Sequence, residues 1–435
     1  MTPADSTPYR RRLAAYAAVT AAYWAFMLTD GALRMLVLLH FHTLGFSPIQ
    51  LAYLFLLYEL MGVVTNLSAG WLAARFGLTS TLYSGLGLQI AALAALARLD
   101  PEWATSTSVI FVMVVQAASG VAKDLAKMSA KSAVKVLAPA SEQGALFRWV
   151  AVLTGSKNTV KGVGFFLGAA LLGLLGFERS VLAMAIGLAV ILLAVMVSMP
   201  PGLPVGRKDA KLREVLSKDP SINRLSAARL FLFGARDTWF VVGVPIYFYA
   251  VLSDGTVAGS RAAFFQIGTF MAAWIVGYGI IQAAAPRLLR ARDKSVTEAV
   301  TLARRWVGAL ALIPTALAGA SLVGTGSAWL TVTLVLGLLL FGAAFALNSA
   351  LHSYLILAFS RSSRVTMDVG FYYMSNAAGR LLGTLLSGVS YQVGGLTACL
   401  AAAAIMTTSS WICASRLERI ALAGDGGRAS SGRAA

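Results

Sequence analysis

Charged residues are scarce in this 435-residue sequence: they make up 12% of it, whereas hydrophobic residues make up 58%. A soluble domain carries about a quarter charged residues. Uncharged runs such as 79–97 and 180–199 are long enough to cross the roughly 30 Å hydrocarbon core of a bilayer. A membrane β-barrel would instead show alternating segments of about ten residues. The composition therefore predicts an all-α polytopic membrane protein.

Cysteine and histidine are rarer still, with two and three residues. Cys399 and Cys413 fall in one expected helix, about 21 Å apart, which is too far for a disulfide or a shared soft-metal site. His40, His42 and His352 show no metal-ligand spacing. We therefore expect neither a metal site nor a cofactor.

Acidic residues number 18 against 36 basic ones, so the formal net charge is +18. In a soluble protein this excess would suggest nucleic acid as a partner, but here it follows the expected topology. About 24 Lys and Arg residues fall in one alternating set of loops and about 3 in the other. The positive-inside rule places the basic loops and both termini in the cytoplasm, with the plasma membrane as the protein's location. The lipid bilayer, and not nucleic acid, is the expected partner.

The apolar stretch after Arg10, Arg11 and Arg12 is too long for the core of a signal peptide and lacks a small-residue cleavage site. We expect it to remain as the first of twelve membrane spans. The spans are expected at 15–40, 49–72, 79–98, 106–128, 145–172, 180–199, 226–252, 262–285, 306–324, 328–358, 367–391 and 396–415.

The longest polar break, 200–223, is rich in Pro, Lys, Arg and Asp. It divides the chain into two six-helix bundles, 1–199 and 224–415, joined by a cytoplasmic linker at 200–223. Residues 416–435 are expected to form a flexible cytoplasmic tail. Asp30 and Asp237 fall at comparable depths in the first span of each half, which is a weak sign of a parallel repeat.

Ionisable residues lie inside spans 1, 2, 4, 5, 7 and 11, whereas spans 3, 6, 9 and 12 carry none away from their ends. A charge at the centre of a membrane helix costs about 2.5–3.5 kcal/mol, and more if it faces lipid. The charged spans are therefore expected to surround a central, water-accessible cavity, while the apolar spans face lipid.

The basic residues of these spans predict a path for an anion. Lysines at 123, 127, 131 and 135 lie on one face of a helix because residues four apart are neighbours there. A small polyanion needs several fixed positive charges inside the bilayer. The expected substrate-binding residues run from a cytoplasmic entrance through mid-depth to an exit pair: Lys123, Lys127 and Arg148, then Lys157, Arg236 and Arg380, then Lys161 and Arg34.

Structural interpretations of the same residues stay open. Asp30 lies one helical turn before Arg34, so the two carry opposite charges at a spacing that favours pairing. Asp124 is adjacent to Lys123 and is a candidate to neutralise part of its charge. Pairing with a carboxylate elsewhere in the chain is the alternative role for Arg236. We interpret Lys131, Lys135 and Arg229 as ordinary positive-inside determinants.

Three carboxylates inside the spans are candidates for proton coupling or charge pairing: Asp30, Glu59 and Asp237. Coupling requires a carboxylate that takes up a proton inside the cavity. Basic surroundings oppose this, because a nearby positive charge favours the ionised form. Uniport and anion exchange therefore remain open beside proton coupling.

Two resemblances add to this interpretation. The twelve spans, and the run Gly70-Trp71-Leu72-Ala73-Ala74-Arg75-Phe76-Gly77 between spans 2 and 3, resemble the major facilitator superfamily and its cytoplasmic loop signature. Ala74 stands where that signature has an Asp. The resemblance implies two six-helix bundles around a central cavity.

A closer resemblance, to the ArsJ-type organoarsenical efflux permeases, is carried by five runs that begin at Thr29, Leu57, Ser119, Leu153 and Phe233. They read Thr29-Asp30-Gly31-Ala32-Leu33-Arg34, Leu57-Tyr58-Glu59 to Val64-Thr65-Asn66-Leu67, Ser119-Gly120-Val121-Ala122-Lys123-Asp124-Leu125, Leu153-Thr154-Gly155-Ser156-Lys157-Asn158 and Phe233-Gly234-Ala235-Arg236-Asp237-Thr238-Trp239-Phe240. What this resemblance implies is export of 1-arseno-3-phosphoglycerate from the bacterial cytoplasm. Glyceraldehyde-3-phosphate dehydrogenase makes this ester when arsenate replaces phosphate, which links that enzyme functionally to the permease. Export of the ester, which then hydrolyses, is what the resemblance implies for arsenate resistance.

Other functions fit less well. An exchanger or exporter of other phosphate esters or organic anions needs the same basic cavity and is the main alternative. A multidrug cation exporter favours an acidic or apolar cavity. The run that ends at Gly155-Ser156-Lys157 does not match a phosphate-binding loop, because Ala151 and Ser156 occupy the positions of its two glycines. An ATP-driven pump is therefore unsupported. A membrane phosphotransferase or hydrolase needs clustered His, Asp or metal ligands, and the sequence shows no such cluster. We therefore expect a transporter and not an enzyme.

Overall fold

The computed structural model describes residues 9–76, 78–137, 145–199, 217, 219–289, 294–324, 327–360 and 365–431. Side chains are described in these ranges except at 9–13, 67, 69–78, 131–137, 145–155, 365–367 and 424–431. The described residues fold into helices and contain no strand. Among them, 11 segments are long and apolar enough to cross a membrane, and one of these, Asp368–Ala423, contains two of the predicted spans. The predicted all-α membrane fold is confirmed.

The chain forms two compact units, which we call unit 1 and unit 2. Unit 1 contains α1 (Tyr9–Thr43), α3 (Leu78–Leu96), α4 (Thr105–Leu137), α5 (Ala145–Leu175), α6 (Phe177–Ser198) and the first part of α9 (Val257–Leu288). Unit 2 contains the first part of α2 (Pro48–Phe76), α7 (Pro220–Phe240), α8 (Gly243–Leu252), the rest of α9, α10 (Val296–Val323), α11 (Ala328–Phe359) and α12 (Val365–Ser431).

The membership of the units does not follow the order of the chain. Residues 45–67, which precede most of unit 1, belong to unit 2, and residues 255–276 belong to unit 1. Each unit therefore includes one segment from the other half of the sequence. The predicted bundles, 1–199 and 224–415, divide the chain by sequence order, and they stay a prediction.

The core of unit 1 joins α1, α3, α4 and α6 through buried apolar side chains such as Tyr23, Phe26, Leu82 and Leu188. Small residues also allow α5 to pack closely against α1. A β-carbon at Gly164 would lie 3.1 Å from the backbone nitrogen of Ala32, and one at Gly168 would collide with the Ala32 backbone. Glycines at these two positions thus allow α1 and α5 to pack closely.

Helix α6 has one buried and one exposed apolar face. Val181, Met184, Ala185 and Leu188 lie on the buried face. On the other face, large side chains are more than half exposed, namely Ile186, Val190, Leu193 and Val197. An apolar face of this length is expected to contact lipid, because in water it would be costly. This agrees with the prediction that span 6 borders the bilayer.

The predicted seventh span is not one helix but two. Helix α7 ends at Phe240 and α8 begins at Gly243. No side chain of the break itself caps α8. Instead, the Ser387 hydroxyl of α12 accepts hydrogen bonds from the backbone N–H groups of Val242 and Gly243, at 3.1 and 3.2 Å. This satisfies two donors that a helix start leaves without an intrahelical partner.

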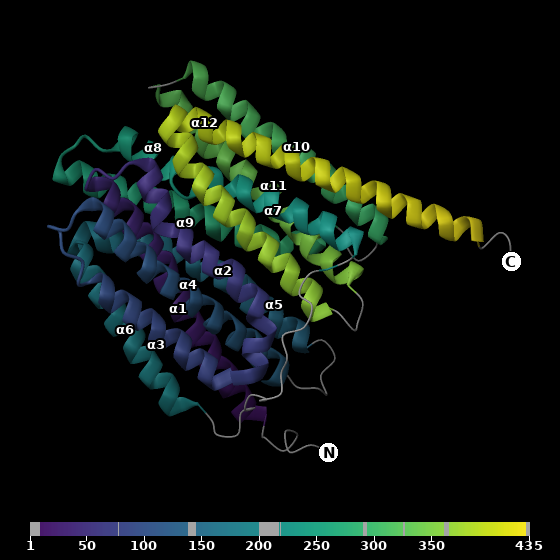
Figure 1. Ribbon diagram of the computed structural model, residues 1–435, viewed down its shortest axis with the longest axis horizontal. Coiled ribbons are helices and arrows are strands. Elements are labelled where there is room, and N and C mark those ends of the chain that lie inside the picture. Colours follow the sequence, from purple (N-terminus) through teal and green to yellow (C-terminus); the bar gives the residue numbers. More distant parts are fainter. Residues whose placement is uncertain are drawn as a thin grey trace. The chain divides into compact units, whose positions relative to one another are not determined.

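Helix α12 consists of two limbs that meet at Gly394 and Gly395, visible in Figure 1 as the lime and yellow parts of the ribbon. Gly395 has φ +60°, a left-handed conformation that glycine adopts at low cost. The break falls between the predicted spans 367–391 and 396–415, so the two limbs correspond to the last two spans.

Helix α7 packs closely against both limbs of α12. A β-carbon at Gly234 would lie 3.0 Å from the Gly379 carbonyl oxygen and would collide with Met406. The Ser410 hydroxyl donates to the Ala228 carbonyl oxygen at 2.8 Å. Glycines on both helices thus allow the backbones to approach, which places the charged residues of α12 beside those of α7.

Candidate functional site

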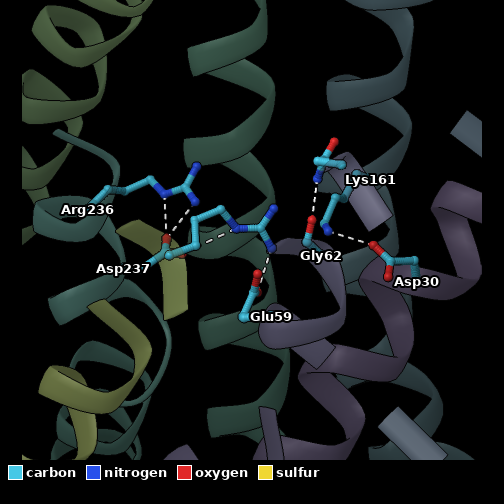
Figure 2. Close-up of polar contacts among 8 residues, drawn as sticks. Asp30, Glu59, Gly62, Lys161, Arg236 and Asp237 are labelled. Atoms are coloured by element: carbon cyan, nitrogen blue, oxygen red, sulfur yellow. Dashed lines mark hydrogen bonds and ion pairs between the residues drawn. The ribbon is translucent and has the colours of Figure 1, made fainter. Parts of the chain in front are cut away.

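Unit 2 contains a network of four buried or half-buried charged residues from three helices. Arg236 and Asp237 are neighbours on α7, with 2.6 Å between Arg236 Nε and Asp237 Oδ1. Arg380 of α12 donates from Nη2 to Glu59 Oε1 of α2 at 2.5 Å, and its Nε lies 3.5 Å from Asp237 Oδ2. Figure 2 shows these contacts. Asp237 therefore faces both arginines.

The glycines that flank Arg380 explain how it reaches Asp237. A β-carbon at Gly383 would lie 2.9 Å from the Asp237 β-carbon, and one at Gly379 would collide with the Leu230 backbone. A larger residue at either position would push α12 away from α7. The sequence around Arg380 thus sets the helix spacing that the ion pair requires.

The network of unit 2 is balanced in formal charge, with two arginines and two carboxylates. Glu59 and Asp237 are completely buried, so each ion would be costly without its partner. We left open whether Arg236 binds substrate or pairs with a carboxylate. The structure pairs it with the adjacent Asp237.

In unit 1, Lys161 of α5 and Asp30 of α1 form an ion pair, with 2.6 Å between Nζ and Oδ2 (Figure 2). The packing of small residues makes this pair possible, because Gly31 lies directly against the Lys161 backbone. A hydrogen bond from Trp24 Nε1 to Ser156 Oγ, 2.8 Å long, joins the same two helices beside Lys157.

The remaining cations of unit 1 lie on α1, α4 and α5. Arg34 and Lys123 are each only 8% exposed, and Lys157 is half-buried. Lys127 forms an ion pair with Asp124, the carboxylate that we had considered as a partner of Lys123.

We call Arg34, Lys123, Lys127, Lys157 and Lys161 the cationic group of unit 1. Away from the helix ends, the described side chains of this unit's spans contain five such cations and two carboxylates, Asp30 and Asp124. The cations therefore exceed the carboxylates by three. This differs from the network of unit 2, where the charges balance.

Some predicted residues fall where the structure does not describe side chains. Arg148 belongs to α5, and Lys131 and Lys135 to α4, in parts of these helices whose side chains lie outside the described residues. The side chains of the loop signature at 70–77 also lie outside the described ones. For these residues the roles stay predictions.

One interpretation from the sequence is wrong. We took Arg229 for a positive-inside determinant at the end of span 7, but it is only 4% exposed and donates from Nη1 to Ser349 of α11. Helix α7 begins at Pro220, with Asp219 as its N-cap, so Arg229 lies well inside the helix. The missed signal was spacing, because Arg229, Phe233 and Arg236 share one helix face.

His, Cys, Asp and Glu side chains do not gather in groups of three or more anywhere in the described part of the chain. The polar chemistry of the described spans is thus that of arginine, lysine and paired carboxylates. Such groups bind anions and exchange ion pairs, which suits the recognition of a charged solute.

A comparison with protein-family models finds one match, over residues 17–303, to the family described as Major Facilitator Superfamily. This region includes α1–α9 and the beginning of α10. The chain belongs to the Major Facilitator Superfamily. No match is found among the curated proteins.

Solved structures of similar fold support this membership. A point mutant of the nucleoside transporter NupG has a TM-score of 0.67 at 17% identity, covering 94% of this chain and 98% of that one. A POT family transporter in complex with a thioalcohol-conjugated peptide has a TM-score of 0.70 at 11% identity, covering 91% and 94%. At these identities the likeness shows the fold alone.

Membership of the Major Facilitator Superfamily makes the chain a multi-pass membrane transporter of the secondary kind. The cationic group of unit 1 and the ion-pair network of unit 2 lie inside helices of that fold.

Proposed function

We propose that this transporter exports a small organic polyanion from the cytoplasm, and that 1-arseno-3-phosphoglycerate is its cargo. The observation that carries the proposal is the excess of cations in unit 1, where five basic side chains accompany two carboxylates inside the spans. An excess of positive charge at bilayer depth is costly unless an anion offsets it. A phosphate or arsenate ester carries negative charge that would offset this excess.

The resemblance of five sequence runs to the ArsJ-type permeases supports the choice of cargo. The buried charged members of these runs, Asp30, Arg34, Glu59, Lys123, Asp124 and Asp237, are among the charged residues of the two units. In this proposal the basic loops and both termini face the cytoplasm of a bacterial cell, and export of the ester gives resistance to arsenate.

Uptake into everted membrane vesicles tests the proposal. Glyceraldehyde-3-phosphate dehydrogenase, glyceraldehyde 3-phosphate, NAD+ and arsenate generate the ester outside the vesicles, with NAD+ accepting the hydride. Arsenate alone and phosphate alone serve as the comparison. We expect arsenic to accumulate with the ester-generating mixture and not with free arsenate. Equal accumulation of free arsenate would contradict an ester cargo.

A pair of variants tests the role of the cations. We expect Lys157→Ala to lower uptake of the ester at least tenfold, because it removes one charge-assisted contact. Arg261→Ala is the matched control, since Arg261 is exposed near the start of α9. Normal uptake by Lys157→Ala at equal membrane abundance would argue against the cationic group as the binding site. Counterflow with other phosphate esters would then identify a different organic anion as cargo.

A further inference from the structure

Arg229 is a buried cation whose charge no carboxylate balances within the described part of unit 2. Its Nη1 donates to neutral acceptors of α11, the Ser349 carbonyl oxygen at 3.1 Å and the Ser349 hydroxyl at 2.9 Å. Its guanidinium carbon lies 3.9 Å from the centre of the Phe233 ring and 5.0 Å from that of Tyr372. Hydroxyl, carbonyl and ring contacts orient the group, but they leave its full charge in place.

Several buried polar atoms of the same unit lack a hydrogen-bond partner. Arg229 Nε, both side-chain polar atoms of Asn348, and His352 Nδ1 are among them. Asn348 and His352 are at most 1% exposed. On α11 these two residues are one turn apart, with Ser349 between them, so Arg229 contacts the same turn of the helix. Such groups are rarely left unsatisfied in proteins without a functional reason.

Ser349 is itself held in place by neighbouring polar groups. Gln282 Nε2 of α9 donates to its hydroxyl at 3.2 Å, and the Tyr278 hydroxyl lies 3.4 Å from the same oxygen. The position of Arg229 is thus fixed by three helices. A positioned arginine loses little freedom when it binds an oxyanion.

The place of Arg229 relates it to the ion-pair network of unit 2. It lies about two helical turns, or about 10 Å, before Arg236 on α7. The same Phe233 ring contacts both guanidinium groups, since that of Arg236 lies 5.0 Å from its centre. Arg236 is paired with Asp237, whereas Arg229 has no such partner among the described residues. An incoming anion therefore gains more from Arg229.

From these observations we infer that Arg229, with Asn348 and His352, forms a second anion contact that receives one oxyanion group of a phosphate ester in unit 2. This inference rests on the proposed transport of organic polyanions and adds a binding residue to it. The guanidinium offers its Nε–H to the oxyanion, and the Asn348 amide adds a further donor.

The purified full chain, in detergent, allows a binding test with 3-phosphoglycerate as the probe, because this ester is stable and carries two anionic groups. We expect Arg229→Met to weaken binding about tenfold to a hundredfold, the range for a lost charge-assisted hydrogen bond. Arg229→Lys keeps the charge and should stay within about tenfold of the wild type. Arg304→Met is the control, because Arg304 is paired with Glu418 at 2.6 Å.

Thermal unfolding without ligand separates binding from a structural role. Removal of an unbalanced buried charge should not lower the unfolding midpoint, so we expect Arg229→Met to be as stable as the wild type or more stable. Equal affinity of Arg229→Met and the wild type for 3-phosphoglycerate would overturn the inference. So would an absence of wild-type binding, or equal losses of affinity in both Arg229 variants together with a lower midpoint.

The vesicle assay distinguishes the failure of this inference from that of the proposed function. If binding depends on Arg229 but the arsenylated ester is not taken up, the proposed cargo is wrong and the anion contact stands. If the ester is taken up and Arg229→Met binds 3-phosphoglycerate normally, the inference is wrong and the transport function stands.

Discussion

Arg380 and Glu59 form an ion pair between α12 and α2, with 2.5 Å from Nη2 to Oε1, although 321 positions separate them in the sequence. Both belong to unit 2, and Glu59 is completely buried. The pair therefore ties a helix of the first half of the chain to one of the last helices.

A double-mutant cycle measures the Arg380–Glu59 pair. Breaking a buried pair costs about 3–5 kcal/mol, because the remaining charge stays buried without its partner. We expect Glu59→Gln and Arg380→Met each to lower the free energy of unfolding by an amount of this order. The double variant should be more stable than the sum of the two effects predicts. Thermal unfolding in detergent checks this, and additive effects would mean that the two side chains do not interact.

Exchanging the charges of Asp30 and Lys161 tests what that pair does. The variant with Asp30→Lys and Lys161→Asp keeps one ion pair between α1 and α5, so we expect normal insertion and an unfolding midpoint near that of the wild type. Ester uptake should nevertheless fall, because the cationic group then presents its charge at a different place. Full uptake by the exchanged variant would show that the pair is structural alone.

Glycine packing between α1 and α5 predicts a strong effect of one methyl group. Gly168→Ala should destabilise the protein by about 1–3 kcal/mol, since its β-carbon would collide with the Ala32 backbone. Gly187→Ala on α6 is the matched control, because a β-carbon there would meet nothing within 4 Å. Unfolding midpoints of the two variants provide the comparison. A similar midpoint for both would mean that α1 and α5 do not pack this closely.

The paired carboxylates predict how transport responds to a pH gradient. Asp30, Glu59 and Asp237 each form an ion pair, so protonation of any of them would break a buried contact. We therefore expect anion exchange. The rate of counterflow in proteoliposomes should change less than about twofold when a pH gradient is imposed. Strong stimulation by the gradient that is lost in both Glu59→Gln and Asp30→Asn would instead establish proton coupling.

The sequence predicted the helices better than their ends and breaks. Hydropathy places the spans because a bilayer requires long apolar segments, and Gly394 and Gly395 fall between two predicted spans. The break between α7 and α8 escaped prediction because Ser387, a residue of another helix, caps α8. Such a contact leaves no local signal at residues 240–243.

The charged residues were identified from the sequence, but the long-range ion pairs between them were not. Asp30 has Arg34 one helical turn away, yet its ion pair with Lys161 joins positions 131 residues apart. Arg229 was misjudged for a different reason. We placed the start of span 7 at residue 226, whereas the helix begins at Pro220, so a residue near an expected end became a buried one. An error of a few residues at a helix start thus hid a candidate binding residue among the charges expected at helix ends.

The exchange of segments between the units has a consequence for how the protein assembles. A chain cut within 200–216 would yield two fragments, and neither would contain a whole unit: the first fragment lacks 255–276, and the second lacks 45–67. Each fragment alone would thus lack one segment of the unit to which most of it belongs. The two halves are expected to be stable when they are co-expressed and to be degraded when either is made alone.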